Sequence, residues 1–159
     1  MELGRRDYLA LWADTPTEEK RNLRCLGEVL ATNPSLPVVT WAGTGADLPR
    51  LRNAVRRLKL RQAIHALESR HLDLYQHVVN AVRFPTPSLA LAEIATYFGI
   101  PKVSRIRDGL EAQFKYMEYR RALDNDTALS RKTDLLEYNR DDLEALVGVA
   151  SRIAALQSP

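Results

Sequence analysis

The sequence contains one cysteine, Cys25, so no disulfide can form within the chain. A lone thiol suits a reducing compartment, and we expect a cytoplasmic protein. No apolar run approaches the roughly 20 residues of a membrane-spanning helix, and residues 1–14 lack the apolar core of a signal peptide. From these absences we expect a protein without a membrane partner.

The 159 residues also lack internal repeats and low-complexity linkers, so we expect a single domain over residues 1–159. Apolar residues make up 45% of the chain, an ordinary share that allows a substantial core and argues against disorder. The formal net charge is +3 and the pI is about 9.2. This charge is compatible with a polyanionic partner but does not identify one.

The first half of the chain alternates between strand-like and helix-like segments. Residues 5–14 alternate large apolar residues with small or charged ones, which predicts a strand. A β-branched run within residues 36–43 predicts a buried strand, and a basic helix is expected over residues 48–60. Between the two strands, a capping box of Thr15 and Glu18 predicts a helix. Its buried stripe is expected to contain Leu23, Leu26, Val29 and Leu30.

The second half reads as helical after a short strand-like opening in residues 70–84. Within residues 84–101, Ser88 is expected to cap a helix that Gly99 and Pro101 end. Residues 103–123 predict an amphipathic helix with an apolar side, and a last helix is expected from Ala128 to Leu156. Together these segments predict an α/β fold with a small sheet flanked by helices and a helical C-terminal half. The apolar side of the amphipathic helix consists of Leu110, Phe114 and Met117.

The first candidate functional residue is Asp47, which follows a glycine loop where the basic helix begins. Functional groups in open α/β sheets collect at the carboxyl ends of strands, and the loop follows such an end. A purely structural role explains the same residue, as the N-cap of the helix after Pro49. The local pattern leaves both interpretations open.

The second candidate is the segment "LLEYNRDDLEAL", residues 135–146, in the last predicted helix. Tyr138 and Asp142 are four positions apart, so they project from the same helix face one turn apart. A carboxylate beside a phenol can bind a hard metal ion and orient a water molecule on it. Asp141 points about a quarter-turn away and is expected to be a bystander. The alternative is an ordinary solvated helix face.

Asp73 is the third candidate, in the strand-like segment "HLDL" of residues 71–74. It is either a further metal ligand, a residue that orients a ligand from behind, or a cap for the next helix. We favour the last two roles.

Cations are dense in and after the basic helix. Six of them fall within twelve positions, which suits neutralisation of phosphates and predicts contact with nucleic acid. They occupy several helical faces and therefore do not form one stripe. These residues are Arg50, Arg52, Arg56, Arg57, Lys59 and Arg61.

The order of four segments is more specific than any one of them. The segments "TWAGTGAD", "RHLDLYQ", "SLALAEIATYFGI" and "LLEYNRDDLEAL" together resemble the back two-thirds of a DEDD-type (DnaQ-like) 3′–5′ exonuclease domain. That domain has the ribonuclease H-like fold. The nearest subgroup is the ribonuclease H-like nuclease domain often fused to RecB-type nucleases, and "GLEAQFKY" resembles its insert. The resemblance spans residues 5–150.

The resemblance implies metal-dependent hydrolysis of phosphodiester bonds in DNA or RNA. Asp47 and Asp142 match the family's metal ligands, and Tyr138 matches the residue that orients the attacking water. Chemistry of this type uses two Mg²⁺ or Mn²⁺ ions about 3.5–4 Å apart. The resemblance therefore implies Mg²⁺ or Mn²⁺ as cofactor and a nucleic acid as partner.

The sequence departs from the family at its first motif, an Asp-x-Glu pair on the central strand. Asp7 and Asp14 flank the run of residues 8–13 without that spacing, and the run resembles the family's third strand instead. We therefore expect an incomplete ribonuclease H-like fold that lacks its first strands and binds metal weakly.

Two explanations of the missing strands stand side by side. The chain is either a fragment or truncated reading frame of a longer nuclease, or a natural reduced protein. A reduced protein would have lost catalysis or would take the strands from a protein partner. The leading function is thus a nuclease domain, and the alternative is a non-catalytic nucleic-acid-binding or assembly module.

Overall fold

A computed structural model describes residues 8–45, 47–122 and 126–156 of the chain. These residues form a two-stranded parallel sheet and seven helices among the described segments, and their C-terminal half is helical. The prediction of an incomplete α/β fold with a small sheet is confirmed. The described residues divide into two compact units. We call Leu9–Arg83 the sheet unit, and Tyr8 with residues 84–156 the helical unit.

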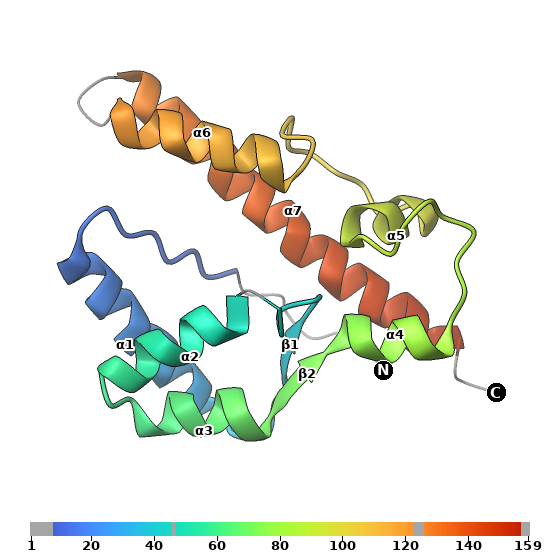
Figure 1. The fold of residues 1–159 in the computed structure, drawn as a ribbon, viewed down its shortest axis with the longest axis horizontal. Coiled ribbons are helices and arrows are strands. Elements are labelled where there is room, and N and C mark those ends of the chain that lie inside the picture. The colour runs from blue at the N-terminus through green and yellow to red at the C-terminus, as the bar shows by residue number, and fades with distance from the viewer. Residues whose placement is uncertain (1–7, 46, 123–125, 157–159) are drawn as a thin grey trace. The chain divides into compact units, whose positions relative to one another are not determined.

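The sheet unit is built around a β–α–β crossover. Strand β1 (Val38–Thr40) pairs in parallel with β2 (His71–Asp73), and Thr40 lies opposite Asp73. Parallel neighbours need a crossover connection, which helices α2 (Asp47–Arg57) and α3 (Arg61–Ser69) supply (Figure 1). Helix α1 (Pro16–Thr32) precedes β1, and α4 (Leu74–Ala81) follows β2 directly.

The core of the sheet unit lies between α2 and α3. Its buried members come from facing turns of these two helices, and partly buried residues of α1, including Leu23 and Leu30, pack against them. Burying such side chains is the main stabilising contribution to a unit of this size. The buried members are Leu48, Val55, Ala63 and Leu67.

Helix α1 begins as the sequence predicts. Thr15 and Glu18 form the expected capping box, because the Thr15 hydroxyl accepts from Glu18 N and the Glu18 carboxylate accepts from Thr15 N. The expected buried stripe is not found, because no residue of α1 is fully buried: Leu23, Leu26 and Leu30 are half-buried, and Val29 is 40% exposed. One side of α1 packs on the α2–α3 core, and Val29 lies outside that contact.

The strand expected over residues 5–14 is wrong for its described part, because residues 8–14 are neither strand nor helix. Neither β1 nor β2 pairs with this segment. Side-chain bonds hold it instead: Trp12 Nε1 donates to Asp14 at 2.8 Å, and the Asn22 amide donates to the Trp12 carbonyl at 2.7 Å. Alternating residues suit a strand, but a strand forms only where a partner ladder is available. Residues 5–7 lie outside the described residues.

The expected strand within residues 36–43 does form, but it is short and only half-buried. A two-stranded sheet has too few neighbours to enclose β1 on both faces.

The helical unit consists of α5 (Leu91–Tyr97), α6 (Gly109–Arg121) and α7 (Asp126–Leu156). Both shorter helices pack along α7, with α6 beside its first half (Figure 1). Ion pairs at this contact join Lys115 to Asp134 at 3.5 Å and Arg131 to Glu118 at 3.4 Å. The buried side chains of the unit include Ile94, Ile106, Tyr119, Leu135, Val149 and Ile153.

Two expectations for these helices need correction. The apolar side expected for α6 is exposed, with Leu110 at 63% and Phe114 at 55%, whereas Tyr119 on the opposite side is buried. The apolar side of α6 is therefore not the side that the fold buries. Ser88 does not cap α5; the N-cap position belongs to Ala90, whose N–H donates to Ser88 Oγ.

Two other expectations hold. Gly99 ends α5 in a left-handed conformation with φ +68, which a residue without Cβ adopts at little cost. The last helix, expected from Ala128 to Leu156, is α7. None of the helices in the described part of the chain combines the length and apolar content that crossing a membrane requires.

Candidate functional site

Helix α7 brings Tyr138 and Asp142 together. They are one helical turn apart, both are half-buried, and each side chain is close enough to shift the pKa of the other. The solvated-face alternative therefore does not describe these two side chains. We call them the Tyr138–Asp142 pair.

The surroundings of the phenol keep it protonated. Burial, the charge of Asp142, the hydrogen bond to Asp142 and the charge of Asp108 together raise the pKa of Tyr138 to about 12. The first residue of α6 is also close, since a Cβ on Gly109 would stand 4.0 Å from the Tyr138 hydroxyl. At neutral pH the side chain is thus a hydrogen-bond donor and not a base.

The carboxylate of the pair is incompletely compensated. Burial raises the pKa of Asp142 above its usual range, and the nearby charge of Asp141 adds to this. The hydrogen bond from Tyr138 and the charge of Lys102 act in the opposite direction without cancelling the increase. A half-buried carboxylate of this kind gains from an added cation, which makes it a candidate for a functional site.

Asp141 has a role that its place in the sequence did not indicate. Its carboxylate accepts the backbone N–H of Val103 at 3.0 Å and that of Ser104 at 2.6 Å. Asp141 is therefore not a bystander in the fold, because its hydrogen bonds attach the segment before α6 to α7. Only the fold could reveal this, since the partners are 37 and 38 positions away in the chain.

A cavity of about 470 Å³ lies beside this attachment. Its lining includes Asp141 and the side of α7 around Gly148, but neither member of the Tyr138–Asp142 pair. The pair and the cavity therefore belong to different sides of α7.

Asp73 performs a structural task in the sheet unit. The residue is 7% exposed, and its carboxylate oxygens accept from Ala42 N at 2.8 Å, from Thr44 N at 3.0 Å and from the Thr44 hydroxyl. Burial by itself raises the pKa of Asp73, but the bonds from Thr44 and Ala42 outweigh it and hold the pKa below its usual value. Asp73 also occupies the N-cap position of α4, although its side chain is committed to the loop.

The glycine loop after β1 is held closely against its own strand. A Cβ on the buried Gly43 would stand 2.5 Å from Thr40 Oγ1, so only glycine fits there. Helix α2 then begins at Asp47 itself, so Asp47 is an exposed first-turn residue and does not cap a helix that starts after Pro49. A carboxylate there is favourable to the helix dipole. The joint use of Asp47 and Asp142 stays a prediction.

The six predicted nucleic-acid contacts divide into two groups. Arg52 donates twice to the Leu67 carbonyl, at 3.3 and 2.7 Å, and so helps to hold α2 against α3. Ion pairs join Arg56 to Glu68 and Arg57 to Glu19. The side chains of the remaining three are exposed and have no hydrogen bond or ion pair to a described residue; these are Arg50, Lys59 and Arg61.

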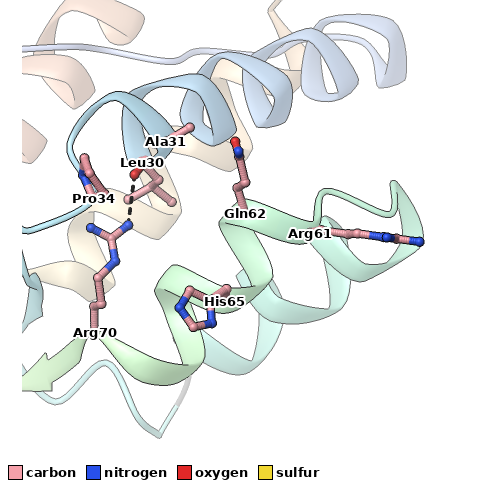
Figure 2. Close-up of a pocket in the computed structure, with 7 residues that line it drawn as sticks. All are labelled: Leu30, Ala31, Pro34, Arg61, Gln62, His65 and Arg70. Carbon is pink, nitrogen blue, oxygen red and sulfur yellow. Dashed lines mark hydrogen bonds between the residues drawn. The ribbon is translucent and has the colours of Figure 1, made fainter.

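Arg61 lines a pocket of about 340 Å³ where the end of α1 meets α3 (Figure 2). His65 and Arg70 line it too, but Arg70 is already committed. Its guanidinium donates to the carbonyls of Leu30 and Leu36, both at 2.9 Å, and so satisfies the C-terminal end of α1 and the turn after it. Arg61 is thus the uncommitted arginine of this pocket.

A divalent metal would find few ligands within either unit. Among the described residues, no group of three or more His, Cys, Asp or Glu side chains lies close enough to hold a metal ion. Asp142 alone therefore does not make a metal site of the strength that several carboxylates provide.

The fold and the site define an incomplete α/β protein with a carboxylate–phenol pair on its C-terminal helix. A family model described as the RNase H superfamily matches residues 4–154. The chain belongs to the RNase H superfamily. Comparison with curated proteins and with solved structures gives no significant match. The expected superfamily is thus confirmed, and the DEDD-type exonuclease subgroup stays a prediction.

Proposed function

We propose that the chain is a metal-dependent phosphodiesterase domain that acts on DNA or RNA from an end, as 3′–5′ exonucleases do. The observation that carries the proposal is the Tyr138–Asp142 pair, in which a protonated phenol meets a carboxylate of raised pKa. Membership of the RNase H superfamily supports a nucleic-acid substrate. The family match runs through both units, which supports one domain built from the two.

The roles proposed for the residues follow from their chemistry. Mg²⁺ or Mn²⁺, when bound, would help to ionise the attacking water and would stabilise the leaving oxygen. Asp142 and Asp47 would be ligands through their carboxylates. Tyr138 keeps its proton at neutral pH, so its hydroxyl would orient the water by hydrogen bonding and would not remove a proton from it. Asp73 would not contact the metal; its hydrogen bonds would position the loop that leads to Asp47.

Metal binding by this chain alone is expected to be weak. The sequence lacks the acidic first motif, and each unit offers few carboxylates for a shared ion. Activity is therefore expected to need a higher metal concentration than a site with four carboxylates would.

The test is a cleavage assay on end-labelled single-stranded DNA and RNA with Mn²⁺ in excess. Asp142→Asn keeps the side-chain volume and should lower the rate at least about 100-fold, the upper end of the loss seen when a residue supporting a metal ligand is removed. Tyr138→Phe should cost about tenfold. Glu93→Gln, at an exposed position on α5, is the matched control and should cleave like the wild type.

The results of this assay distinguish the proposed site from other sites and the nuclease function from the second candidate function. Cleavage that survives Asp142→Asn would exclude the Tyr138–Asp142 pair as the site. A wild type that binds the strand but does not cleave it would favour the second candidate function. That candidate is a non-catalytic nucleic-acid-binding or assembly module, favoured by the exposed and uncommitted Arg50, Lys59 and Arg61. Its mark would be salt-dependent binding without turnover.

A further inference from the structure

The segment between α5 and α6 carries a cluster of cations next to the Tyr138–Asp142 pair. Lys102, Arg105 and Arg107 occur within six positions, and all three are exposed. We call residues 102–107 the basic loop. It belongs to the helical unit and is separate from the basic stretch of α2 and α3.

The backbone of the basic loop is firmly held. Asp141 accepts the N–H groups of Val103 and Ser104, and Ser104 Oγ accepts the N–H of Ile106 at 3.1 Å. Ser104 is 8% exposed and Ile106 only 1%. Because these two residues point inward, Arg105 between them points outward from an anchored backbone. Such preorganisation lowers the conformational entropy lost when a ligand binds.

Lys102 connects the loop to the candidate site. Its ammonium lies 5.4 Å from the centre of the Tyr138 ring and donates to the Arg107 carbonyl at 3.0 Å. An ammonium group has three donors, so this bond leaves donors available for another acceptor. Lys102 is therefore a cation fixed at the edge of the pair, with capacity left for a phosphate oxygen.

The neighbouring acidic residues Glu111 and Asp108 do not pair with Lys102 or Arg105. Arg107 is paired with Glu111, at 3.0 Å, and Asp108 is occupied in capping α6 by accepting the N–H of Glu111. No hydrogen bond or ion pair joins Arg105 to any described residue. Arg105 thus carries a positive charge without a partner among the described residues, and Lys102 keeps donors for a further acceptor although its charge also acts on Asp142.

We propose that the basic loop binds the phosphate backbone of a single nucleic-acid strand, with Lys102 on the phosphate nearest the Tyr138–Asp142 pair and Arg105 on a neighbouring phosphate. This inference rests on the proposed function, which makes a nucleic-acid strand the ligand. It adds the surface of the protein that would bind that strand. A phosphodiester backbone presents anionic oxygens at regular spacing, which two fixed cations on one loop can neutralise together.

The experiment measures binding of fluorescently labelled single-stranded DNA and RNA to the full chain by anisotropy, without divalent metal. Lys102→Gln and Arg105→Gln should each weaken binding about fourfold at 0.15 M salt, the counterion-release value for one lost contact. Each should also reduce the slope of log Kd against log salt by about 0.7. Lys102→Arg keeps the charge and should bind like the wild type. Arg152→Gln removes an exposed arginine elsewhere on α7 and is the matched control.

The outcomes separate this inference from the nuclease proposal. Lys102→Gln and Arg105→Gln binding as tightly as Arg152→Gln would overturn the inference, even if the wild type cleaves. Weakened binding by both, with no cleavage by the wild type, would support the inference and remove the nuclease function. A wild type that binds neither strand at low salt would also overturn it. Thermal melts of each variant identify any that fail to fold, and Lys102→Arg then tests the charge alone.

Discussion

The sheet unit and the helical unit each hold one notable carboxylate, and the two are in opposite electrostatic states. Asp73 accepts from two backbone N–H groups and a hydroxyl, so its pKa lies below the usual value. Asp142 is half-buried, and burial keeps its pKa above the usual value although the Tyr138 phenol acts in the opposite direction. The first carboxylate is fully used by the fold. The second is left with capacity for a ligand, which is the physical basis for placing function there.

The cations of the two units repeat this contrast. In the sheet unit Arg52 joins α2 to α3 through the Leu67 carbonyl, and Arg56 and Arg57 form exposed ion pairs with Glu68 and Glu19. In the helical unit the backbone of the basic loop is held by the Asp141 carboxylate, so the cations of the loop are not needed to hold it. Density of positive charge in the sequence is therefore a weaker guide to a binding surface than the number of cations without internal partners.

The strongest test of the contrast between carboxylates is Asp73→Asn. An amide replaces one carboxylate oxygen with an NH₂ group, which cannot accept a hydrogen bond. N–H groups of the glycine loop that now donate to Asp73 would therefore lose their acceptor. We expect a loss of about 3 kcal/mol in the free energy of unfolding at neutral pH, measured by urea denaturation. Because the folded-state pKa of Asp73 lies below 3.8, the difference should be complete above that value and shrink as pH falls through the folded pKa. An unchanged midpoint at neutral pH would contradict the assignment.

A smaller effect is expected from Gly43→Ala. The new Cβ would meet the stiff, β-branched Thr40 at 2.5 Å, so the loop has to move away from β1. Overpacking of this kind costs about 2 kcal/mol, again seen by urea denaturation. Gly148→Ala is the comparison, because its closest contact would be Cδ1 at the end of the Ile100 side chain, at 2.6 Å, which rotation about the last side-chain bond can move; Ile100 Cγ1, at 3.1 Å, has to shift by only a few tenths of an ångström. Replacing a helical glycine also gains about 1 kcal/mol of helix propensity, so Gly148→Ala should be nearly neutral. Equal losses for the two variants would show that the loop is not specially constrained.

The smallest expected effect has the opposite sign. The pKa of Asp142 is raised in the folded state. Below pH 3.8, the usual carboxyl pKa, the side chain is neutral in both states and costs the fold nothing. Above the folded-state pKa it is charged, and the half-buried charge lowers the free energy of unfolding. Asp142→Asn should therefore raise the thermal midpoint at neutral pH by roughly 1–3 °C. The gain should disappear in acid, where both side chains are neutral. Calorimetry at the two pH values measures this, and a lowered midpoint at neutral pH would mean that Asp142 is a structural carboxylate like Asp73.

Local signals in the sequence were sufficient for several elements. Helix α1 has a capping box, α5 ends at a glycine in the left-handed conformation, and α7 has sustained helical spacing. The four-residue separation of Tyr138 and Asp142 is likewise enough to place both side chains on one helix face. Each of these features depends on residues within one or two helical turns of each other, so it can be predicted from residues that are close in the sequence.

Features that depend on distant partners could not be predicted in this way. The alternation over residues 8–13 suggested a strand, but no partner ladder exists for it among the described strands. The apolar side of α6 stays exposed and the side of Tyr119 is buried, because apolar residues occur on both sides of that helix and only the packing decides between them. Asp141 looked like a bystander in the sequence, whereas the fold brings Val103 and Ser104 to its carboxylate.

By itself the sequence determined the class of fold, the approximate positions of α1, α2, α5 and α7, though not that of α3, and the placing of a phenol and a carboxylate on one face of α7. Only the tertiary structure decided which charged groups are committed and which are free. A carboxylate or guanidinium has the same donors and acceptors wherever it occurs in a chain. Whether those groups are satisfied depends on backbone atoms that folding brings from far along the sequence, as it does for Asp73, Arg52 and Asp141.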